Sequence, residues 1–193
     1  MLIVMPNLCR LKVDYYYYHA IHISEHEWER IISNYLLKLE TFHLNMVDYF
    51  RGNKIVDEQV DELLNTYRTP FWLDKYGWFV RCDWNPGIGN FYLYTLPYAF
   101  GYFDISDSTI WKSTCLDKKN QYTYDAMHHL NYDVKPEQFP QLSGIQFYKL
   151  KKLTITCPIS DHFWSMFPTF DHLTSCEILS NHNSEECQKQ IQL

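Results

Sequence analysis

Five short segments of the chain share one pattern of apolar positions, apolar-x-x-apolar-x-apolar. In the C-terminal half three such segments begin at Met127, Leu150 and Leu173 and are evenly spaced, whereas in the N-terminal half two begin at Leu8 and Leu39, a longer offset. Equal offsets in series indicate an internal repeat. The five triplets are Leu8/Leu11/Val13, Leu39/Phe42/Leu44, Met127/Leu130/Tyr132, Leu150/Leu153/Ile155 and Leu173/Cys176/Ile178.

Each triplet predicts a short strand entered by a tight bend. Its last two apolar positions have period 2 and so point to the same face of a strand. Such a unit cannot bury its apolar side alone and needs neighbours, and a period of roughly 20–29 residues is typical of leucine-rich repeats. We therefore predict an α/β fold, a leucine-rich-repeat solenoid segment with parallel strands on the concave face and helices or loops on the convex face.

The segments between the triplets carry helix signals. Ser24, with Glu27 three positions further on, forms a capping box, and apolar residues then recur with helical spacing up to about Lys38. Further helices are predicted at residues 56–67, 160–167 and 185–193. Strands and helices are thus expected to alternate along the chain.

The middle of the chain, residues 69–125, is irregular. Trp78–Trp84 and Phe91–Leu96 read as two strands around a Gly- and Pro-containing turn, which we interpret as a hairpin-like insertion in the stack. The polar stretch 104–120 is expected to be loop. Residues 1–193 are expected to form a single leucine-rich-repeat domain. The first repeats span residues 1–68, the insertion spans 69–125 and the last repeats span 126–193. The sequence at each end of the chain is interpreted as that of a shortened chain or fragment.

Composition bounds the class of protein. The 193 residues are 46% hydrophobic and 18% aromatic, which suffices for a packed core and favours strands. The formal net charge of -6 argues against a nucleic-acid partner, which would need a basic surface. No apolar run approaches about 18 residues, so no membrane partner is expected. The six cysteines include no C-x-x-C pair, which favours a reduced protein of the cytoplasm or nucleus.

Several of these segments, together with the middle of the chain, resemble a known family. The segments are Met5–Val13, Leu37–Leu44 and Leu150–Ile155, with Thr69–Trp72, Trp78–Trp84 and Leu96–Phe100 from the middle. They are similar to segments of F-box/leucine-rich-repeat (F-box-like) proteins. In that family an F-box docks on a Skp-type adaptor of a cullin ubiquitin ligase, and the repeats capture the substrate. No F-box precedes Met5 here, so the resemblance implies the repeat region only, with adaptor and cullin as partners only if an F-box lies upstream.

Residue clusters that could carry chemistry are better explained by structural roles. His19, His22 and His26 are close enough in sequence to suggest a metal site, but no carboxylate or cysteine completes the set. Cys82 has no recognisable Cys/His signature around it, and Cys176 occupies a core position of a triplet. We predict no catalytic residue, no metal ligand and no cofactor.

Other motifs have a stronger structural than functional explanation. The Gly87–Gly89 segment lacks the further residues of a phosphate loop and reads as a turn. The acidic residues of the 56–67 helix read as a solvated face, and the four consecutive tyrosines at 15–18 as a packed loop more than a binding hot spot. His128 and His129 should point to opposite sides of a strand, one of them toward a binding surface.

The predicted function is non-enzymatic recognition of a protein client whose identity the sequence does not give. The polar residues that alternate with the core positions of the strands are the candidate concave-surface contacts. They are Lys12, His43, Asn131, Thr154 and Glu177. The favoured role is the substrate-binding repeat region of an F-box-type ubiquitin-ligase receptor. The alternatives are a stand-alone leucine-rich-repeat scaffold without a ligase role and a small cysteine-dependent enzyme.

Overall fold

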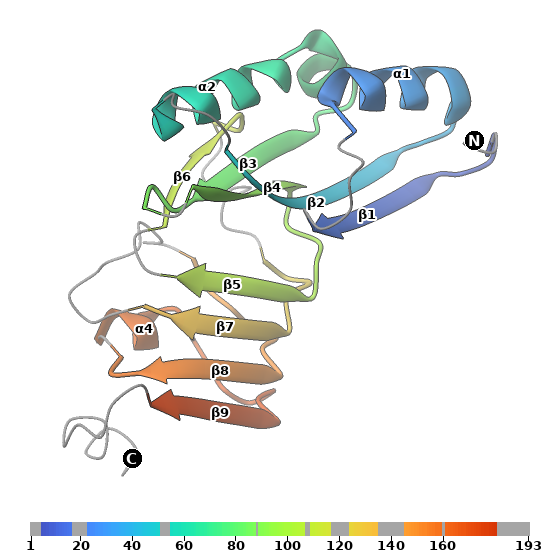
Figure 1. The fold of residues 1–193 in the computed structure, drawn as a ribbon. Helices are drawn as coiled ribbons and strands as arrows, with labels where there is room; N and C mark the ends of the chain where they lie inside the picture. The colour runs from blue at the N-terminus through green and yellow to red at the C-terminus, as the bar shows by residue number, and fades with distance from the viewer. Residues whose placement is uncertain are drawn as a thin grey trace. The chain divides into compact units, whose positions relative to one another are not determined.

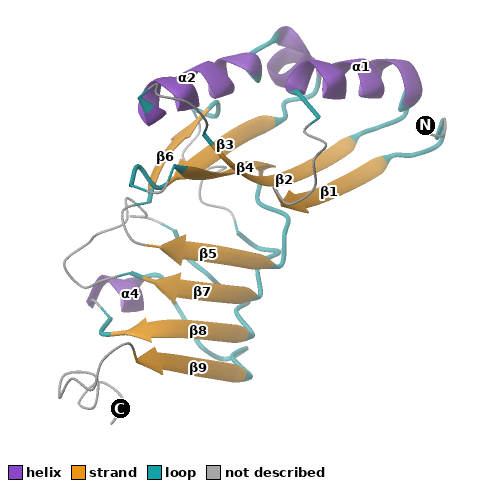
Figure 2. Ribbon diagram, viewed as in Figure 1, coloured by secondary structure: helices purple, strands orange, loops and turns teal. Residues whose placement is uncertain are grey.

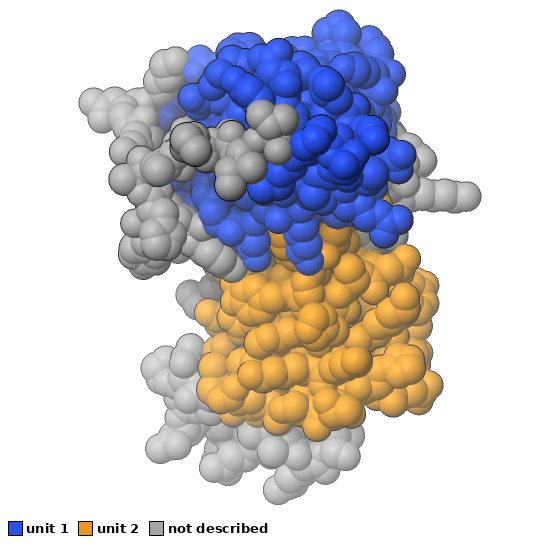
Figure 3. Space-filling model, turned by 90° about the vertical axis from the view of Figure 1, so that its right-hand side faces the viewer, with its two compact units in different colours: residues 1–96, 111–121 blue, residues 97–110, 122–193 orange. Residues whose placement is uncertain are grey.

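A computed structural model divides the chain into two compact units, which are coloured separately in Figure 3. Unit 1 contains residues 1–96 and 111–121, and unit 2 contains residues 97–110 and 122–193. The structure describes residues 5–16, 23–50, 55–87, 89–106, 109–116, 124–134, 145–159 and 161–180. Each unit is built around one β-sheet (Figure 1).

The sheet of unit 1 is mixed. Its strands are β1 (Arg10–Tyr16), β2 (Thr41–Tyr49), β3 (Phe79–Trp84), β4 (Asn90–Leu96) and β6 (Ile110–Ser113). They are arranged in the order β1-β2-β4-β3-β6. β1 and β2 are parallel, with Leu11 opposite Phe42 and Val13 opposite Leu44, whereas β4 is antiparallel to both β2 and β3. The pairing of the two N-terminal triplets is therefore confirmed.

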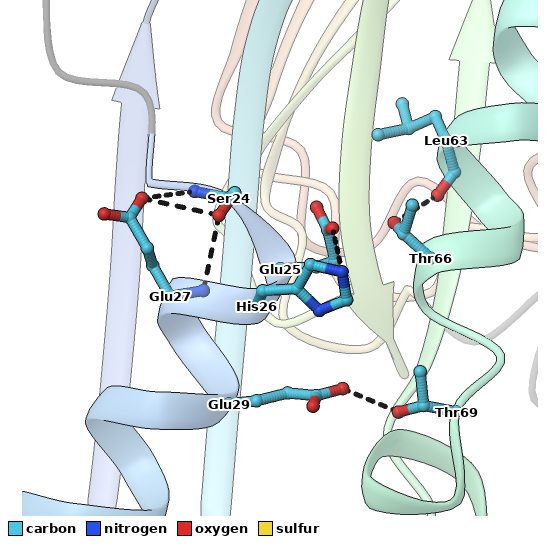
Figure 4. A network of polar contacts seen from close by, with 8 residues as sticks. All are labelled: Ser24, Glu25, His26, Glu27, Glu29, Leu63, Thr66 and Thr69. Atoms are coloured by element: carbon cyan, nitrogen blue, oxygen red, sulfur yellow. Dashed lines mark hydrogen bonds and ion pairs between the residues drawn. The ribbon is translucent and has the colours of Figure 1, made fainter.

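Two helices lie on the same face of this sheet (Figure 1, Figure 2). They are α1 (Glu25–Tyr35) and α2 (Val56–Thr66), and the π-helical turn η1 (Phe71–Lys75) comes after α2. Ser24 Oγ accepts a hydrogen bond from the Glu27 amide at 3.3 Å, and the Glu27 carboxylate accepts one from the Ser24 amide at 3.1 Å (Figure 4). The predicted capping box and both predicted helices of this region are confirmed.

The core of unit 1 is centred on one aromatic side chain of β2. Phe42 lies with its ring centroid 5.0 Å from that of Trp28 on α1, 6.0 Å from that of Trp72 on η1 and 5.5 Å from that of Trp78. Aromatic pairs of this kind contribute about 0.5–1.5 kcal/mol each beyond the area they bury. Helix, turn and sheet are thus held together by contacts that meet at Phe42.

The sheet of unit 2 is entirely parallel. Its strands are β5 (Tyr102–Ser106), β7 (His129–Asp133), β8 (Lys152–Cys157) and β9 (Ser175–Ser180), in the order β5-β7-β8-β9. Leu130 lies opposite Leu153, and Leu153 opposite Cys176, so two successive pairs keep the same offset along the chain. The prediction that the C-terminal triplets form parallel neighbouring strands is confirmed.

The same backbone contact sets the register wherever two parallel strands meet. One carbonyl oxygen, just before a strand or at its entry bend, accepts hydrogen bonds from two consecutive amides that lead into the next strand. In unit 1 the Cys9 carbonyl accepts from the amides of Glu40 and Thr41. In unit 2 the Gly101 carbonyl accepts from the amides of His128 and His129, the His128 carbonyl from those of Lys151 and Lys152, and the Lys151 carbonyl from those of Thr174 and Ser175. All of the N···O distances are 2.8–3.0 Å. A side chain at Gly101 would overlap the exposed His128 ring, which would have to move to accommodate it.

One face of the unit 2 sheet is covered by aromatic and aliphatic side chains. α4 (Asp161–Ser165) forms where the sequence predicts a short helix at 160–167. It places Phe163 edge-on against Tyr132 of β7, with ring centroids 4.8 Å apart, and the Phe167 ring lies 4.8 Å from that of Phe163. Leu130 and Tyr132 on this face are fully buried.

The prediction that the chain forms a leucine-rich-repeat solenoid is wrong. The described residues form a mixed α/β fold with two separate sheets, one mixed and one parallel, and few helices. The triplets specify local parallel pairing, but they do not specify which element the chain forms after each pair. After β2 the chain forms the antiparallel strands β3 and β4, and β4 occupies the edge of β2 that a solenoid would give to another parallel strand.

The middle of the chain is not an insertion. β3 and β4 form the predicted hairpin, but this hairpin supplies central strands of the unit 1 sheet. The stretch 104–120, expected to be loop, contributes most of β5 and all of β6. In β5 the apolar residues Phe103 and Ile105 alternate with polar ones, as expected for a strand with one covered face.

The predicted helix at residues 185–193 lies outside the described residues. Within the described part of the chain, no helix combines the length and apolar character needed to cross a membrane.

We predict that Ser24→Ala lowers the free energy of unfolding by about 1 kcal/mol, because the amides at the start of α1 lose their side-chain acceptor. Ser33→Ala, at an exposed position of the same helix, is the matched control and should change it by only a few tenths. Urea unfolding observed by circular dichroism measures both. Equal effects of the two variants would show that the cap does not stabilise the fold.

Candidate functional site

The five residues predicted as surface contacts fall into two groups, one in each unit. Asn131, Thr154 and Glu177 lie opposite one another on β7, β8 and β9, so they form a single row across the sheet of unit 2. Lys12 and His43 lie opposite each other on β1 and β2 of unit 1. The fold therefore brings three of the five together.

The row of three belongs to a larger polar surface, which we call the polar face of unit 2. Two neighbouring rows of the register define it: Tyr102, His129, Lys152 and Ser175, and next to it Asp104, Asn131, Thr154 and Glu177. These side chains are all at least partly exposed. Side chains alternate between the two faces of a strand, so the core residues lie on the opposite side of the same sheet.

His129 lies near the middle of the polar face and is flanked by residues of two other strands. Its ring is 5.1 Å from that of Tyr102 in an edge-on arrangement, and the Tyr102 hydroxyl donates a hydrogen bond of 2.6 Å to the Asp104 carboxylate. Partial burial lowers the pKa of His129, and the positive charge of Lys152 lowers it further. Tyr102 is 38% exposed, so an aromatic ring and a neutral imidazole are both available for contact at neutral pH.

The chemistry of this face suits polar contact with another macromolecule. It presents both signs of charge through Lys152 and Glu177, together with amide, hydroxyl and imidazole groups held on paired strands. Side chains on regular strands keep fixed spacing, which favours complementary hydrogen bonding.

Tyr102, Asp104 and Lys152 are not among the predicted contacts. Tyr102 and Asp104 lie on β5, most of which is expected from its polar residues to be a loop. The alternation around Phe103 and Ile105 is the signal that could have identified the strand.

Unit 1 contains a second polar cluster, which is buried. Arg81 Nε lies 2.7 Å from Asp83 Oδ1, and the Tyr94 hydroxyl donates a hydrogen bond of 2.6 Å to Asp83 Oδ2. The Arg81 guanidinium also lies 4.3 Å from the ring centroid of Trp111. Arg81 is 0% and Asp83 2% exposed, so this network serves the packing of the sheet and offers no accessible ligand site.

Lys12 and His43 lie opposite each other in unit 1, and the charge of Lys12 affects the pKa of His43. Lys12 is exposed, and partial burial and the nearby Lys12 charge lower the pKa of His43. In the next row on the same strands, Asn45 donates a hydrogen bond of 2.9 Å to Asp14, which ties β2 to β1.

The described residues contain no cluster of three or more His, Cys, Asp or Glu side chains arranged to hold a metal. Of the three clustered histidines only His26 is described; it is exposed and pairs with Glu25 at 3.4 Å (Figure 4). Cys82 is buried, and burial raises its pKa well above the usual value, which disfavours the thiolate that a nucleophile requires. Cys176 is exposed, and the partial burial of its thiol raises its pKa.

The remaining motifs have local partners. The Tyr15 hydroxyl contacts the Met46 sulfur, and burial raises the pKa of Tyr15 to about 12, whereas Tyr17 and Tyr18 lie outside the described residues. The acidic helix face is not simply solvated, because Asp57 and Asp61 both pair with Lys112 of β6, at 2.9 and 2.8 Å.

Comparison of the chain with models of protein families, with curated protein sequences and with solved structures finds no match. The resemblance to F-box/leucine-rich-repeat proteins therefore stays a prediction from the residues themselves.

We predict that Asp83→Asn lowers the free energy of unfolding by about 3 kcal/mol, because the buried Arg81 guanidinium loses the carboxylate that it contacts at 2.7 Å and the Tyr94 hydroxyl loses a charged acceptor. Asp74→Asn makes the same chemical change at an exposed position and should have little effect. Urea unfolding of both variants tests this. A loss in Asp83→Asn no larger than that in Asp74→Asn would contradict it.

A pH effect is expected from His129. The pKa of His129 in the folded chain lies below its unfolded value of 6.5. As the pH falls below 6.5, the unfolded chain therefore binds a proton more readily than the folded chain does, and the free energy of unfolding decreases. Above that pH the imidazole is neutral in both states and contributes no pH dependence. His129→Gln should lose this part of the decline, which unfolding curves on either side of the unfolded pKa would measure. An unchanged pH dependence in the variant would contradict the assignment.

Proposed function

We propose that the chain is a non-enzymatic protein-recognition module and that the polar face of unit 2 is its contact surface. The observation that carries the proposal is the row of Asn131, Thr154 and Glu177 on three hydrogen-bonded strands. These positions are evenly spaced along the chain and converge on one partly exposed face, flanked by Tyr102 and His129.

Several properties of this face support recognition. Tyrosine gives large contact area at a low cost in side-chain entropy and is enriched at protein interfaces. Lys152 and Glu177 add charges that favour one orientation of a partner. The side chains of this face stand on strands fixed by backbone pairing, so little ordering is needed on binding.

The narrower role, capture of substrates for an F-box-type ubiquitin ligase, is supported only by the family resemblance. It predicts that the transcript encodes an F-box upstream of Met1 and that the longer protein binds a Skp-type adaptor. A chain that begins at Met1 would favour the stand-alone binding module.

The contact surface is tested by the double variant Asn131→Arg/Thr154→Arg, which places two bulky cations on the polar face. Ser33→Arg/Asn34→Arg, on the exposed side of α1, introduces the same charge elsewhere. We expect proteins that bind the wild-type chain in quantitative affinity capture to be lost from the first variant and retained by the second. Circular dichroism confirms that both variants are folded.

The proposal fails if the first variant, shown to be folded, retains the same proteins as the control. Glu177 is left unchanged in this experiment because it also lies on the edge strand β9, where a substitution would affect two surfaces at once.

A further inference from the structure

Among the described residues, the strand β9 lies at the edge of the parallel sheet of unit 2 and pairs only with β8. Its core-side residues are uncovered: Cys176 is exposed and Ile178 is 43% exposed, whereas the equivalent residues of β8, Leu153 and Ile155, are buried. An open, apolar strand edge of this kind is a template for another strand.

The backbone of β9 specifies how the next strand must pair. The Ser175 amide bonds to the Lys151 carbonyl on the β8 side, so by alternation the amides and carbonyls of Cys176 and Ile178 point to the open edge. The series of register-setting carbonyls, His128 and then Lys151, continues at the same spacing with Thr174. Among the described residues, no amide donates to the Thr174 carbonyl.

The strand β1 of unit 1 offers the matching edge. Among the described residues β1 pairs only with β2, and the Cys9 carbonyl points toward β2. Alternation then directs the backbone groups of Arg10, Lys12 and Asp14 to the open side. In a parallel pair, a residue whose backbone groups point toward the neighbouring strand lies opposite a residue whose backbone groups point away from it. Leu11 can therefore lie opposite Cys176, with the hydrogen bonds of Cys176 made to Arg10 and Lys12 on either side of Leu11.

We propose that the open edge of β9 pairs in parallel with the open edge of β1 of a second copy of this chain, with Leu11 opposite Cys176 and Lys12 opposite Glu177. In this register Val13 also lies opposite Ile178, so apolar residues meet apolar residues and a cation meets an anion. The amides of Cys9 and Arg10 then supply the donors for the Thr174 carbonyl. The contact is head-to-tail, and it does not depend on the proposed binding function.

A symmetric alternative fits the charges less well. Antiparallel pairing of β9 with β9 of another copy would bring the two Glu177 side chains to the same region of the interface, and like charges on facing strands are destabilising. The β1 edge, with Lys12 and Arg10 exposed, is complementary to Glu177 instead.

Charge exchange tests the register. Analytical ultracentrifugation of the whole chain over a concentration series should show self-association that weakens about tenfold in Lys12→Glu and in Glu177→Lys, since each creates a like-charge pair. The double variant Lys12→Glu/Glu177→Lys should restore it, and so should a mixture of the two single variants. Lys149→Glu and Glu58→Lys, both exposed elsewhere, are the matched controls and should associate as the wild type does.

Proline at Cys176 tests the edge itself. The Cys176 amide points away from β8, so Cys176→Pro removes no bond within the sheet but blocks a strand added outside it. A chain that is monomeric at all concentrations would overturn the proposal. Self-association that is unchanged in both Lys12→Glu and Glu177→Lys would also overturn it. If that association is nevertheless lost in Cys176→Pro, the contact is assigned to pairing of β9 with β9 of another copy.

Discussion

The parallel parts of both sheets depend on one repeated hydrogen-bonding arrangement, a carbonyl oxygen near the start of a strand that binds two successive amides of the chain entering the next strand. It occurs at Cys9 in unit 1 and at Gly101, His128 and Lys151 in unit 2. Because it joins the beginnings of two strands through backbone atoms alone, it holds the two strands in one register. A shift by one residue would turn every apolar side chain to the wrong face, so this contact determines which residues form the core and which remain for binding.

The two faces of the unit 2 sheet result from that register. Leu130, Leu153 and Tyr132 lie on one side and are buried, with Phe163 packed against Tyr132, while Asn131 and Thr154 lie on the other. A candidate surface of this kind cannot be separated from the core, because the same alternation produces both. Changes that disturb the core side can therefore move the polar face even where they leave its residues unchanged.

Features that depend on neighbouring residues or on a repeated spacing are predicted from the sequence, whereas the order of the strands in the mixed sheet is not. The capping box at Ser24, the helix that it begins and the pairing of Leu130 with Leu153 depend on neighbouring residues or on a repeated spacing, and these are confirmed. The course of the chain after β2 depends on which edge of β2 the hairpin of β3 and β4 occupies, and no local pattern specifies that choice. The polar face is predicted in part: Asn131, Thr154 and Glu177 result from alternation. Tyr102 and Asp104 are missed because the start of the expected loop at residue 104 divides β5 and hides its alternation.

The buried ion pair of Arg81 and Asp83 has a consequence for how this sequence can change over time. The two residues are separated by a single position on β3, so each carries its counter-ion with it whenever that strand is extended, whatever the remainder of the sheet does. Loss of either charge alone removes a 2.7 Å ion pair from a group that is buried. Descendants of this chain should therefore retain both charges or replace both with apolar residues, and Tyr94 would lose its hydroxyl acceptor in the second case.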